Sequence, residues 1–327
     1  MGKWRSGLCF WPRFAYLCRL FMGAYKVLLY YCYTHIENAQ EFAEAHLKYC
    51  KELHLKGRII VAAEGINGTV SGLTADCEQY MRDLKADPRF ASTDFKVDDA
   101  DEHVFNKMHV RHKPEIVHLG LRNGNDVDPN RRTGTHLSPK EFLEMKDRED
   151  VVVVDMRSDY EYELGKFKNA VTLGLENFRD LPENLHKLEP YKGKKIVTYC
   201  TGGIKCEKAS ALLLENGFED VYQLEGGVVK YAKETGGKDF DGELYVFDGR
   251  IKVPVNSVNP TTVSKCHICG TPSTRMVNCA NPECNIHTTI CDTCGVTYDG
   301  GCSVACMEHP RKRPYTPKGY YPKPPVD

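Results

Sequence analysis

The sequence predicts a protein of several domains that combines α/β and α+β folds and ends in a small cysteine-rich module. Three observations support this fold class. Residues 25–98 alternate between strand and helix patterns in the order β-α-β-β-α-β. A short apolar strand pattern at 195–199 leads through a cysteine and two glycines directly into a helix pattern. Eight of the fifteen cysteines lie between positions 266 and 306, which indicates a separate module there.

The composition is that of an ordinary soluble protein, with 41% hydrophobic and 27% charged residues in a chain of 327. This length is sufficient for two or three domains, each with its own core. The formal net charge is −1, so the chain as a whole has no strong attraction for nucleic acid. Binding to RNA would therefore require a locally basic face.

Residues 1–24 weakly imitate a secretory signal, because basic residues precede an apolar and aromatic stretch. Arg13 and Arg19 interrupt that stretch, so it is too short for a signal core or a membrane span. We therefore expect a cytoplasmic protein. The segment is either a genuine N-terminal extension or lies upstream of a true start at Met22.

Residues 25–120 are predicted to form a ferredoxin-like domain. The patterns indicate strands at 26–33, 58–63, 69–71 and 94–98, and helices at 39–53 and 75–86. The segment Ile66-Asn67-Gly68-Thr69 is typical of a hairpin turn, because asparagine and glycine both tolerate positive φ. This succession matches the split β-α-β unit of ferredoxin-like domains.

Basic residues gather at two places after this domain's last predicted strand. The first group is Lys107, His109, Arg111, His112 and Lys113. Arg131 and Arg132 lie in residues 121–137, which are rich in turn formers and which we interpret as a linker. Lys107, Arg111, Lys113, Arg131 and Arg132 are the candidates to contact RNA phosphates. The alternative for the first group is a solvated, charged strand.

A second domain is predicted for residues 138–240. A capping-box pattern at Ser138-Pro139-Lys140-Glu141 opens a helix. The apolar run at 151–154 is typical of a parallel strand buried on both faces, and 195–199 supplies a second, less apolar strand. Because helix patterns separate these strands, the domain is predicted to be a parallel α/β sheet.

Cys200 is the candidate nucleophile of this domain. It lies between a strand and a helix, so the helix N-terminus directs backbone N–H groups at its sulfur. Gly202 and Gly203 allow the loop to curl around the sulfur, and Lys205 adds a positive charge. These features favour a thiolate. The alternative is a small buried cysteine of the core.

Two further residues could support the Cys200 loop. Arg157 follows a strand end, where open α/β sheets place their ligands, and could face the loop. Its alternative role is a pair with Asp155 that pins the turn. Cys206 could resolve an oxidised or persulfidated Cys200 as a disulfide, and its alternative role is helix packing.

Three segments of this domain resemble the rhodanese family, in the family's order. They are residues 152–161, the active loop Cys200-Thr201-Gly202-Gly203-Ile204-Lys205, and residues 221–227. The resemblance implies that Cys200 can carry sulfur as a persulfide. Lys166 departs from the family pattern, which often has histidine there.

A closer resemblance, from about Tyr25 to Cys306, is to the bacterial oxygen-dependent tRNA uridine hydroxylases. Residues 63–69, 200–209 and 242–248 carry it. It implies tRNA as partner, molecular oxygen as co-substrate, and hydroxylation of the wobble uridine to 5-hydroxyuridine through Cys200. Lys205 departs from the arginine of many relatives, and a point charge weakens any bidentate contact with an oxyanion.

The alternative function is a rhodanese-type sulfurtransferase, for which residues 138–237 would suffice. A non-catalytic RNA- or protein-binding module is disfavoured by the intact cysteine loop. No glycine motif for a dinucleotide cofactor occurs in the chain. The sequence indicates neither the electron donor nor the oligomeric state.

Residues 241–309 are predicted to combine a hairpin around Asp248-Gly249 with a metal-binding module. Four cysteine pairs carry that prediction: Cys266 and Cys269, Cys279 and Cys284, Cys291 and Cys294, Cys302 and Cys306. Thiolates at this spacing suit tetrahedral zinc, and four pairs could form two closed, structural sites, either consecutive or interleaved. Nearby histidines are substitute ligands: His267, His287 and His309. A disulfide framework is the alternative, which a reducing compartment disfavours.

Residues 310–327 form a basic tail rich in proline and tyrosine, without hydrophobic periodicity. We expect this tail to be extended and solvated. Its lysines and arginines alternate with tyrosines, a pattern that could also follow RNA through phosphates and stacking.

Overall fold

The computed structural model describes residues 24–121 and 127–316. The chain divides into two units, residues 1–116 and 117–327, which we describe separately. The predicted N-terminal extension up to residue 23 and the last part of the tail, from residue 317, lie outside the described residues.

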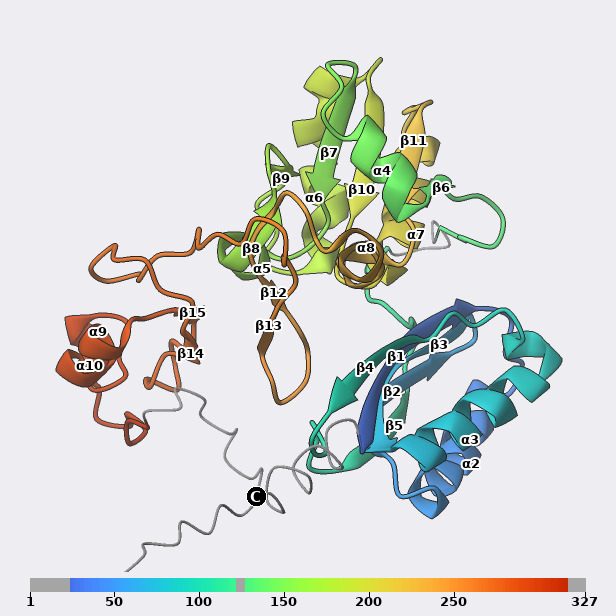
Figure 1. Ribbon diagram of the computed structural model, residues 1–327, viewed down its shortest axis with the longest axis horizontal. Helices are drawn as coiled ribbons and strands as arrows, with labels where there is room; N and C mark the ends of the chain where they lie inside the picture. The colour runs from blue at the N-terminus through green and yellow to red at the C-terminus, as the bar shows by residue number, and fades with distance from the viewer. Residues whose placement is uncertain (1–23, 122–126, 317–327) are drawn as a thin grey trace, which may run out of the picture. The chain divides into compact units, whose positions relative to one another are not determined.

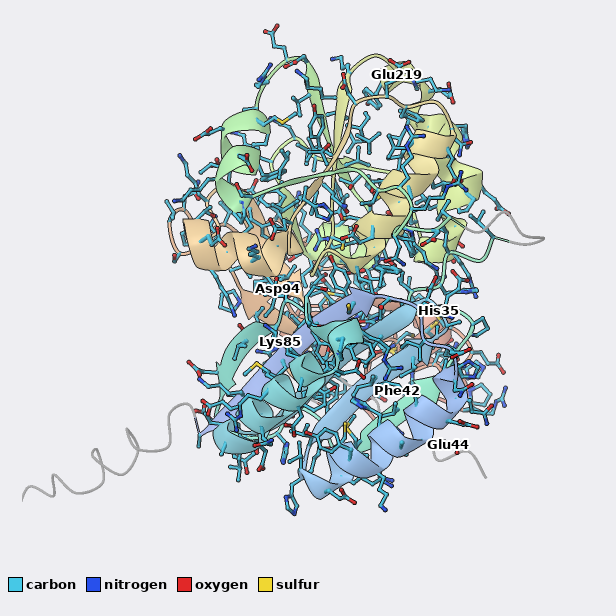
Figure 2. The ribbon with its side chains drawn as sticks, turned by 90° about the vertical axis from the view of Figure 1, so that its right-hand side faces the viewer. His35, Phe42, Glu44, Lys85, Asp94 and Glu219 are labelled. Carbon is cyan, nitrogen blue, oxygen red and sulfur yellow. The ribbon has the colours of Figure 1, made fainter. Side chains whose placement is uncertain are left out.

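The first unit is a five-stranded sheet with two helices on one face (Figures 1 and 2). Its strands are β1 (Tyr25–Tyr33), β2 (Lys56–Ala62), β3 (Gly65–Leu73), β4 (Lys96–Ala100) and β5 (Met108–His112), and its helices are α2 (Ala39–Glu52) and α3 (Thr74–Ala86). The strand order is β4-β1-β3-β2-β5. The first four strands pair as in ferredoxin-like domains, so that prediction is confirmed. Figure 2 shows Phe42 on α2 and Lys85 on α3.

Two details of this unit differ from the prediction. The hairpin between β2 and β3 turns at residues 63–64, because Ala62 pairs with Gly65. Asn67 and Gly68 lie inside β3 instead. Gly68 is needed there because a Cβ would come within 2.5 Å of the Tyr30 hydroxyl. The predicted turn was wrong because a glycine that permits close packing resembles a turn glycine in sequence.

The second difference is strand β5, which contains three of the basic residues placed after the last predicted strand. It pairs in parallel with β2, from Gly57 and Met108 to Val61 and His112. Its side chains are mostly exposed apart from Met108, which joins the core of the unit. Met108 and the partly buried Val110 alternate with exposed basic residues, so β5 is the solvated, charged strand that we considered as the alternative for the first basic group.

The second unit contains a parallel five-stranded sheet in the order β6-β11-β10-β7-β9 (Figure 1). The strands are β6 (Thr135–Leu137), β7 (Val151–Asp155), β9 (Val171–Thr172), β10 (Lys195–Tyr199) and β11 (Val221–Leu224), and the helices are α4 (Pro139–Met145), α5 (Asp159–Leu164), α6 (Leu181–Asn184), α7 (Ile204–Glu215) and α8 (Gly227–Thr235). The prediction of a parallel α/β domain is confirmed.

The start of this unit includes residues that we interpreted as a linker. Strand β6 lies at the end of that segment and pairs with β11. Val127 is buried in the same core as Val152 and Val154 of β7. The segment therefore contributes to the fold of the second unit, although its many turn formers mask this in the sequence.

The chain continues into a second small sheet and the cysteine-rich module. The small sheet has β8 (Gly165–Phe167), β12 (Phe240–Tyr245) and β13 (Lys252–Pro254), and the module has β14 (Met276–Asn278), β15 (His287–Thr289), α9 (Asp292–Thr297) and α10 (Val304–Met307). The predicted hairpin around Asp248 is formed by β12 and β13, with a longer turn than expected. Among the described residues, no helix has the length and apolarity required to cross a membrane.

Candidate active site

Cys200 lies directly after β10, where the chain turns into α7. Gly203 has φ of 101°, a left-handed conformation that favours glycine, and it precedes the first residue of the helix. Its backbone N–H donates to the Cys200 Sγ at 3.2 Å. The loop thus wraps around the sulfur, which is almost completely buried.

The surroundings of Cys200 favour its ionised form. Burial raises the pKa of the thiol, but a hydrogen bond from the Cys206 thiol, the charge of Lys205 and backbone N–H groups of the loop outweigh it. Together they lower the pKa of Cys200 to about 6. Burial and the adjacent Cys200 sulfur raise the pKa of Cys206. Cys200 is therefore the thiolate of the pair near neutral pH.

Glu161, which our sequence reasoning missed as a site residue, holds the cation of the loop. It is fully buried in the first turn of α5. Its carboxylate accepts hydrogen bonds from the Lys205 Nζ at 3.0 Å and the Thr201 Oγ1 at 3.3 Å. It also accepts from the Ser158 backbone N–H at 3.1 Å, as in a capping box. The Ser158-x-x-Glu161 spacing was the available sequence signal.

The N-terminus of α8 holds the other side of the loop. The Val228 N–H donates to the Cys200 carbonyl at 3.0 Å, and the Val229 N–H donates to the Thr201 carbonyl at 3.1 Å. Gly227 lies so close to the loop that a Cβ would be 2.5 Å from the Cys200 carbonyl oxygen. The active loop is thus fixed between the N-termini of α7 and α8. This close contact also explains Gly227, which in the sequence resembled only a turn residue.

Arg157 and Asp155 form the pair that we considered as the alternative. Arg157 is fully buried, and its Nε and Nη2 reach the Asp155 carboxylate at 2.9 and 2.6 Å. Its Nη2 also donates to the Gly165 carbonyl at 2.6 Å, and the Tyr199 hydroxyl donates to Asp155 at 2.5 Å. These contacts pin the turn after β7. The arginine is satisfied mainly by this buried pair instead of by the Cys200 loop, and local spacing could not decide between the two.

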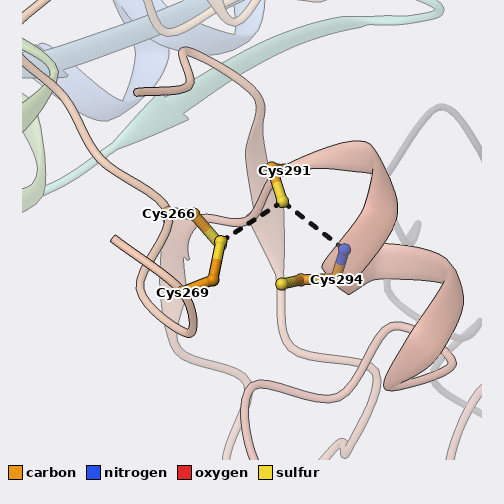
Figure 3. Close-up of side chains that lie close together, drawn as sticks. All are labelled: Cys266, Cys269, Cys291 and Cys294. Atoms are coloured by element: carbon orange, nitrogen blue, oxygen red, sulfur yellow. Dashed lines mark hydrogen bonds between the residues drawn. The ribbon is translucent and has the colours of Figure 1, made fainter. Parts of the chain in front are cut away.

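The eight cysteines of the C-terminal module form two groups of four. One group is Cys266, Cys269, Cys291 and Cys294 (Figure 3), and the other is Cys279, Cys284, Cys302 and Cys306. The first and third pairs of the sequence therefore combine, as do the second and fourth. This is the interleaved arrangement of the two that the spacing left open.

The geometry of these groups fits a tetrahedral metal site. Within each group, the sulfur atoms all lie within 4.8 Å of one another. The Sγ atoms of Cys269 and Cys291 are 3.7 Å apart, and so are the Sγ atoms of Cys284 and Cys302. Four thiolates at about 2.3 Å from a zinc ion would be about 3.8 Å apart, whereas a disulfide requires about 2.05 Å. All described cysteines are free, so each group could hold a metal ion.

The candidate histidines are not members of the two groups. His287 packs its ring at 5.2 Å from the Tyr160 ring and 5.3 Å from the Tyr245 ring. His309 bonds to Glu283 at 3.2 Å. His287 thus packs against Tyr160, which is adjacent in sequence to Glu161.

Three family models match successive parts of the chain. They are the UPF0176 acylphosphatase like domain at residues 25–116, the rhodanese-like domain at 138–234 and the rhodanase C-terminal model at 241–307. A tRNA uridine(34) hydroxylase from Cytophaga hutchinsonii is 58% identical over 302 residues, which cover 92% of this chain and 96% of that protein. The corresponding protein of Bacillus licheniformis is 53% identical and covers 88% and 89%. The chain belongs to the tRNA uridine(34) hydroxylase family.

In this hydroxylase family member, the candidate RNA contacts occur in both units. Lys107, Arg111 and Lys113 are exposed on or beside β5. Burial lowers the pKa of His109, as do the positive charges of Arg111, Arg58 and Lys107. The arrangement is a charged edge strand, and its positive potential suits phosphate.

Arg131 and Arg132 lie in the unit that contains Cys200. Both are exposed, and their backbone N–H groups donate to the Asp128 carbonyl at 3.0 and 3.2 Å. The nearby Thr133 donates to Glu207 of α7 at 3.0 Å. This places the two arginines close to the helix that begins at the active loop.

The described first part of the tail contains no helix or strand and keeps Arg311 exposed, as we expected, but it also contacts the cysteine-rich module. Arg311 and Lys312 pair with Glu283 and Asp299 of the cysteine-rich module. The Arg313 backbone N–H donates to the Ala280 carbonyl at 3.0 Å. The sequence did not predict these contacts because the partners lie far away along the chain. The charges of Arg311 and Lys312 are thus paired within the module of this hydroxylase family member.

The low pKa of Cys200 leads to a test with iodoacetamide. The alkylation rate should be half-maximal near pH 6 and should fall below it, because protonation removes the thiolate. Lys205→Ala removes a charge that lowers the pKa, so the midpoint should move upward, toward about 8.5. The rate is measured by mass spectrometry of the Cys200 peptide.

The control for this test is Lys192→Ala. Lys192 lies in the same unit and pairs with Glu189 at 2.8 Å. This substitution should leave the pH midpoint of Cys200 alkylation unchanged. Equal midpoints for the two variants would show that the Lys205 charge does not set the reactivity of the thiol.

Proposed function

We propose that this chain hydroxylates uridine 34 of tRNA to 5-hydroxyuridine, using molecular oxygen and Cys200. The main support is a buried cysteine with a lowered pKa in a preorganised loop, within a chain that matches tRNA uridine(34) hydroxylases over nine-tenths of its length. A tRNA substrate also implies a cytoplasmic enzyme.

The Cys200 thiolate supplies the chemistry in this proposal. Its addition to C6 of the uracil ring would make C5 electron-rich, so that C5 accepts oxygen; an oxidised form of the cysteine sulfur is the other route. One atom of molecular oxygen bonds to C5. The second leaves as water, which consumes two electrons and two protons from an external donor. Cys206, which donates a hydrogen bond to Cys200, would resolve an oxidised sulfur as a disulfide.

The basic residues would hold the RNA. We assign phosphate contacts to Lys107, Arg111 and Lys113 of the first unit and to Arg131 and Arg132 of the second. Each such contact releases counterions, so affinity for tRNA should fall steeply as salt rises.

The two cysteine groups would each hold one structural zinc ion. Four thiolates would fill the coordination sphere of each ion, which leaves no open position for chemistry. Backbone N–H groups support the sulfurs, since Cys294 donates to Cys291 and Cys302 donates to Cys279, each at 3.4 Å. The ions would therefore stabilise the module without entering the reaction.

Mass spectrometry of nucleosides tests the proposed function. Unmodified tRNA is incubated with the purified protein and a reductant under air, under ¹⁸O-labelled oxygen and under nitrogen. We expect 5-hydroxyuridine at position 34 only with oxygen, and one ¹⁸O atom in the product. Unchanged tRNA, together with Cys200-dependent transfer of sulfur from thiosulfate to cyanide, would replace this proposal with the sulfurtransferase.

A further inference from the structure

Phe247 has a solvent-exposed aromatic side chain beside the active loop. The residue is 47% exposed. In the described part of the chain, the other exposed large hydrophobic residues are aliphatic: Leu73, Val258, Ile286, Val296 and Val304. An exposed ring near a reactive cysteine differs from scattered surface aliphatics, which are common in proteins and need no explanation.

Phe247 lies close to Lys205, the residue whose charge helps to lower the pKa of Cys200. It lies in the turn between β12 and β13, and β12 runs beside α5, the helix that carries Glu161 (Figure 1). The centre of its ring is 5.7 Å from the Lys205 Nζ. Lys205 in turn bonds to Glu161 and helps to ionise Cys200. The ring therefore borders the same cation that activates the nucleophile.

The ring is held in place instead of being free to move with the turn. It packs edge-on against the Tyr245 ring at 5.1 Å, and Tyr245 packs against Tyr160 at the same distance. The turn itself is closed by Asp248, whose carboxylate accepts from the Arg250 Nε at 2.9 Å and Nη2 at 2.6 Å. An aromatic residue that is anchored on one side and exposed on the other is preorganised to receive a flat ligand.

We propose that Phe247 stacks against the uracil base of nucleotide 34 when tRNA presents it to Cys200. This inference rests on the proposed function, which supplies the base. Proteins that recognise single-stranded RNA loops commonly splay bases out and stack them on aromatic rings. Enzymes that modify a base also extrude it from its stack. Lys205 adds charge complementarity, since a cation beside the ring suits the carbonyl oxygens of uracil and the RNA backbone.

Substitution of Phe247 tests this assignment by kinetics. An anticodon stem-loop with uridine at position 34 is the substrate, and 5-hydroxyuridine is quantified. If the base stacks on this ring, Phe247→Ala should lower kcat/KM about tenfold to a hundredfold, because the stacking interaction is lost. Phe247→Trp should retain activity within about threefold of wild type, because it keeps the stacking surface. Val258→Ala, at another exposed hydrophobic residue of the same unit, should have no effect.

Two further measurements separate stacking from a structural role. The pH midpoint of Cys200 alkylation should be the same in Phe247→Ala as in wild type if the loop is intact. A stem-loop with 5-iodouridine at position 34 should crosslink to the peptide that contains Phe247 upon irradiation, and Phe247→Ala should lose that crosslink.

The outcomes distinguish this inference from the proposed function. If wild-type protein hydroxylates the stem-loop while Phe247→Ala retains full kcat/KM, the stacking assignment is overturned and the function stands. A crosslink only to an aromatic residue of the first unit would also overturn it. If wild-type protein leaves uridine 34 unmodified, the proposed function itself fails.

Discussion

Cys200→Ala should reduce the formation of 5-hydroxyuridine by at least about a thousandfold, because loss of a nucleophile typically costs enzymes this much or more. The Cys200 sulfur accepts hydrogen bonds from the Gly203 N–H and the Cys206 thiol, whereas an alanine side chain can accept neither of them. Cys200→Ser tests the same point with a smaller change, since the serine hydroxyl stays protonated at neutral pH. Both variants are assayed by nucleoside mass spectrometry at saturating oxygen.

The matched control for this prediction is Cys50→Ala. Cys50 is as deeply buried as Cys200, but it lies in the core of the first unit. Burial raises the pKa of Cys50 to about 12, so it stays a thiol at neutral pH. This variant should retain activity. If Cys200→Ala modifies tRNA at the wild-type rate, the cysteine is not the reacting group, and the loop serves a different purpose.

Pairs of cysteine substitutions should reveal both the metal and the interleaved connectivity of the C-terminal module. Cys266 and Cys291 belong to the same group, so the double variant Cys266→Ser/Cys291→Ser should lose one of two zinc ions per chain. Cys266 and Cys279 belong to different groups, so Cys266→Ser/Cys279→Ser should lose both. A consecutive arrangement of sites would exchange these two results. Elemental analysis of purified protein measures the zinc directly.

The loss of zinc should also unfold the module. Its hydrophobic core is small, with Cys266, Val277, Ile290 and Cys294 as the buried members. A core of this size cannot fold a domain alone, whereas a structural zinc site contributes about 10–16 kcal/mol of apparent binding free energy. Limited proteolysis should therefore cleave residues 266–306 after chelation and spare them in the metal-loaded protein. Purified protein without metal and with a protease-resistant module would contradict the zinc proposal.

Several features followed from sequence alone because they depend on neighbouring residues. The capping box at Ser138 is present, with the Ser138 Oγ accepting from the Glu141 N–H at 3.3 Å. The all-valine run became β7, and the Cys200 loop turned into α7 as the two glycines and the helix pattern indicated. The pairing of cysteines that are separated by two to four intervening residues also follows from local spacing.

Other features were decided by packing between distant residues. Asn67-Gly68 resembles a hairpin turn, yet Gly68 serves the close approach of Tyr30. Arg157 could have faced the loop, but a bidentate contact with Asp155 inside the core holds its Nε and Nη2, while its buried Nη1 has no hydrogen-bond partner among the described residues. The basic residues of the early tail meet acidic partners in the module, which no window of neighbouring residues contains.

The candidate active site shows the same division. Local sequence predicted the candidate nucleophile Cys200, its glycines and its cation, because a strand, a loop and a helix N-terminus are set within about ten residues. Only the tertiary structure brought Glu161 into contact with Lys205, the α8 N-terminus against the loop, and the Phe247 ring close to the Lys205 ammonium group. Likewise, spacing determined which cysteines pair, but the fold of the module decided which pairs share a site. Short-range geometry follows from the covalent chain, whereas contacts between segments depend on which surfaces are buried together.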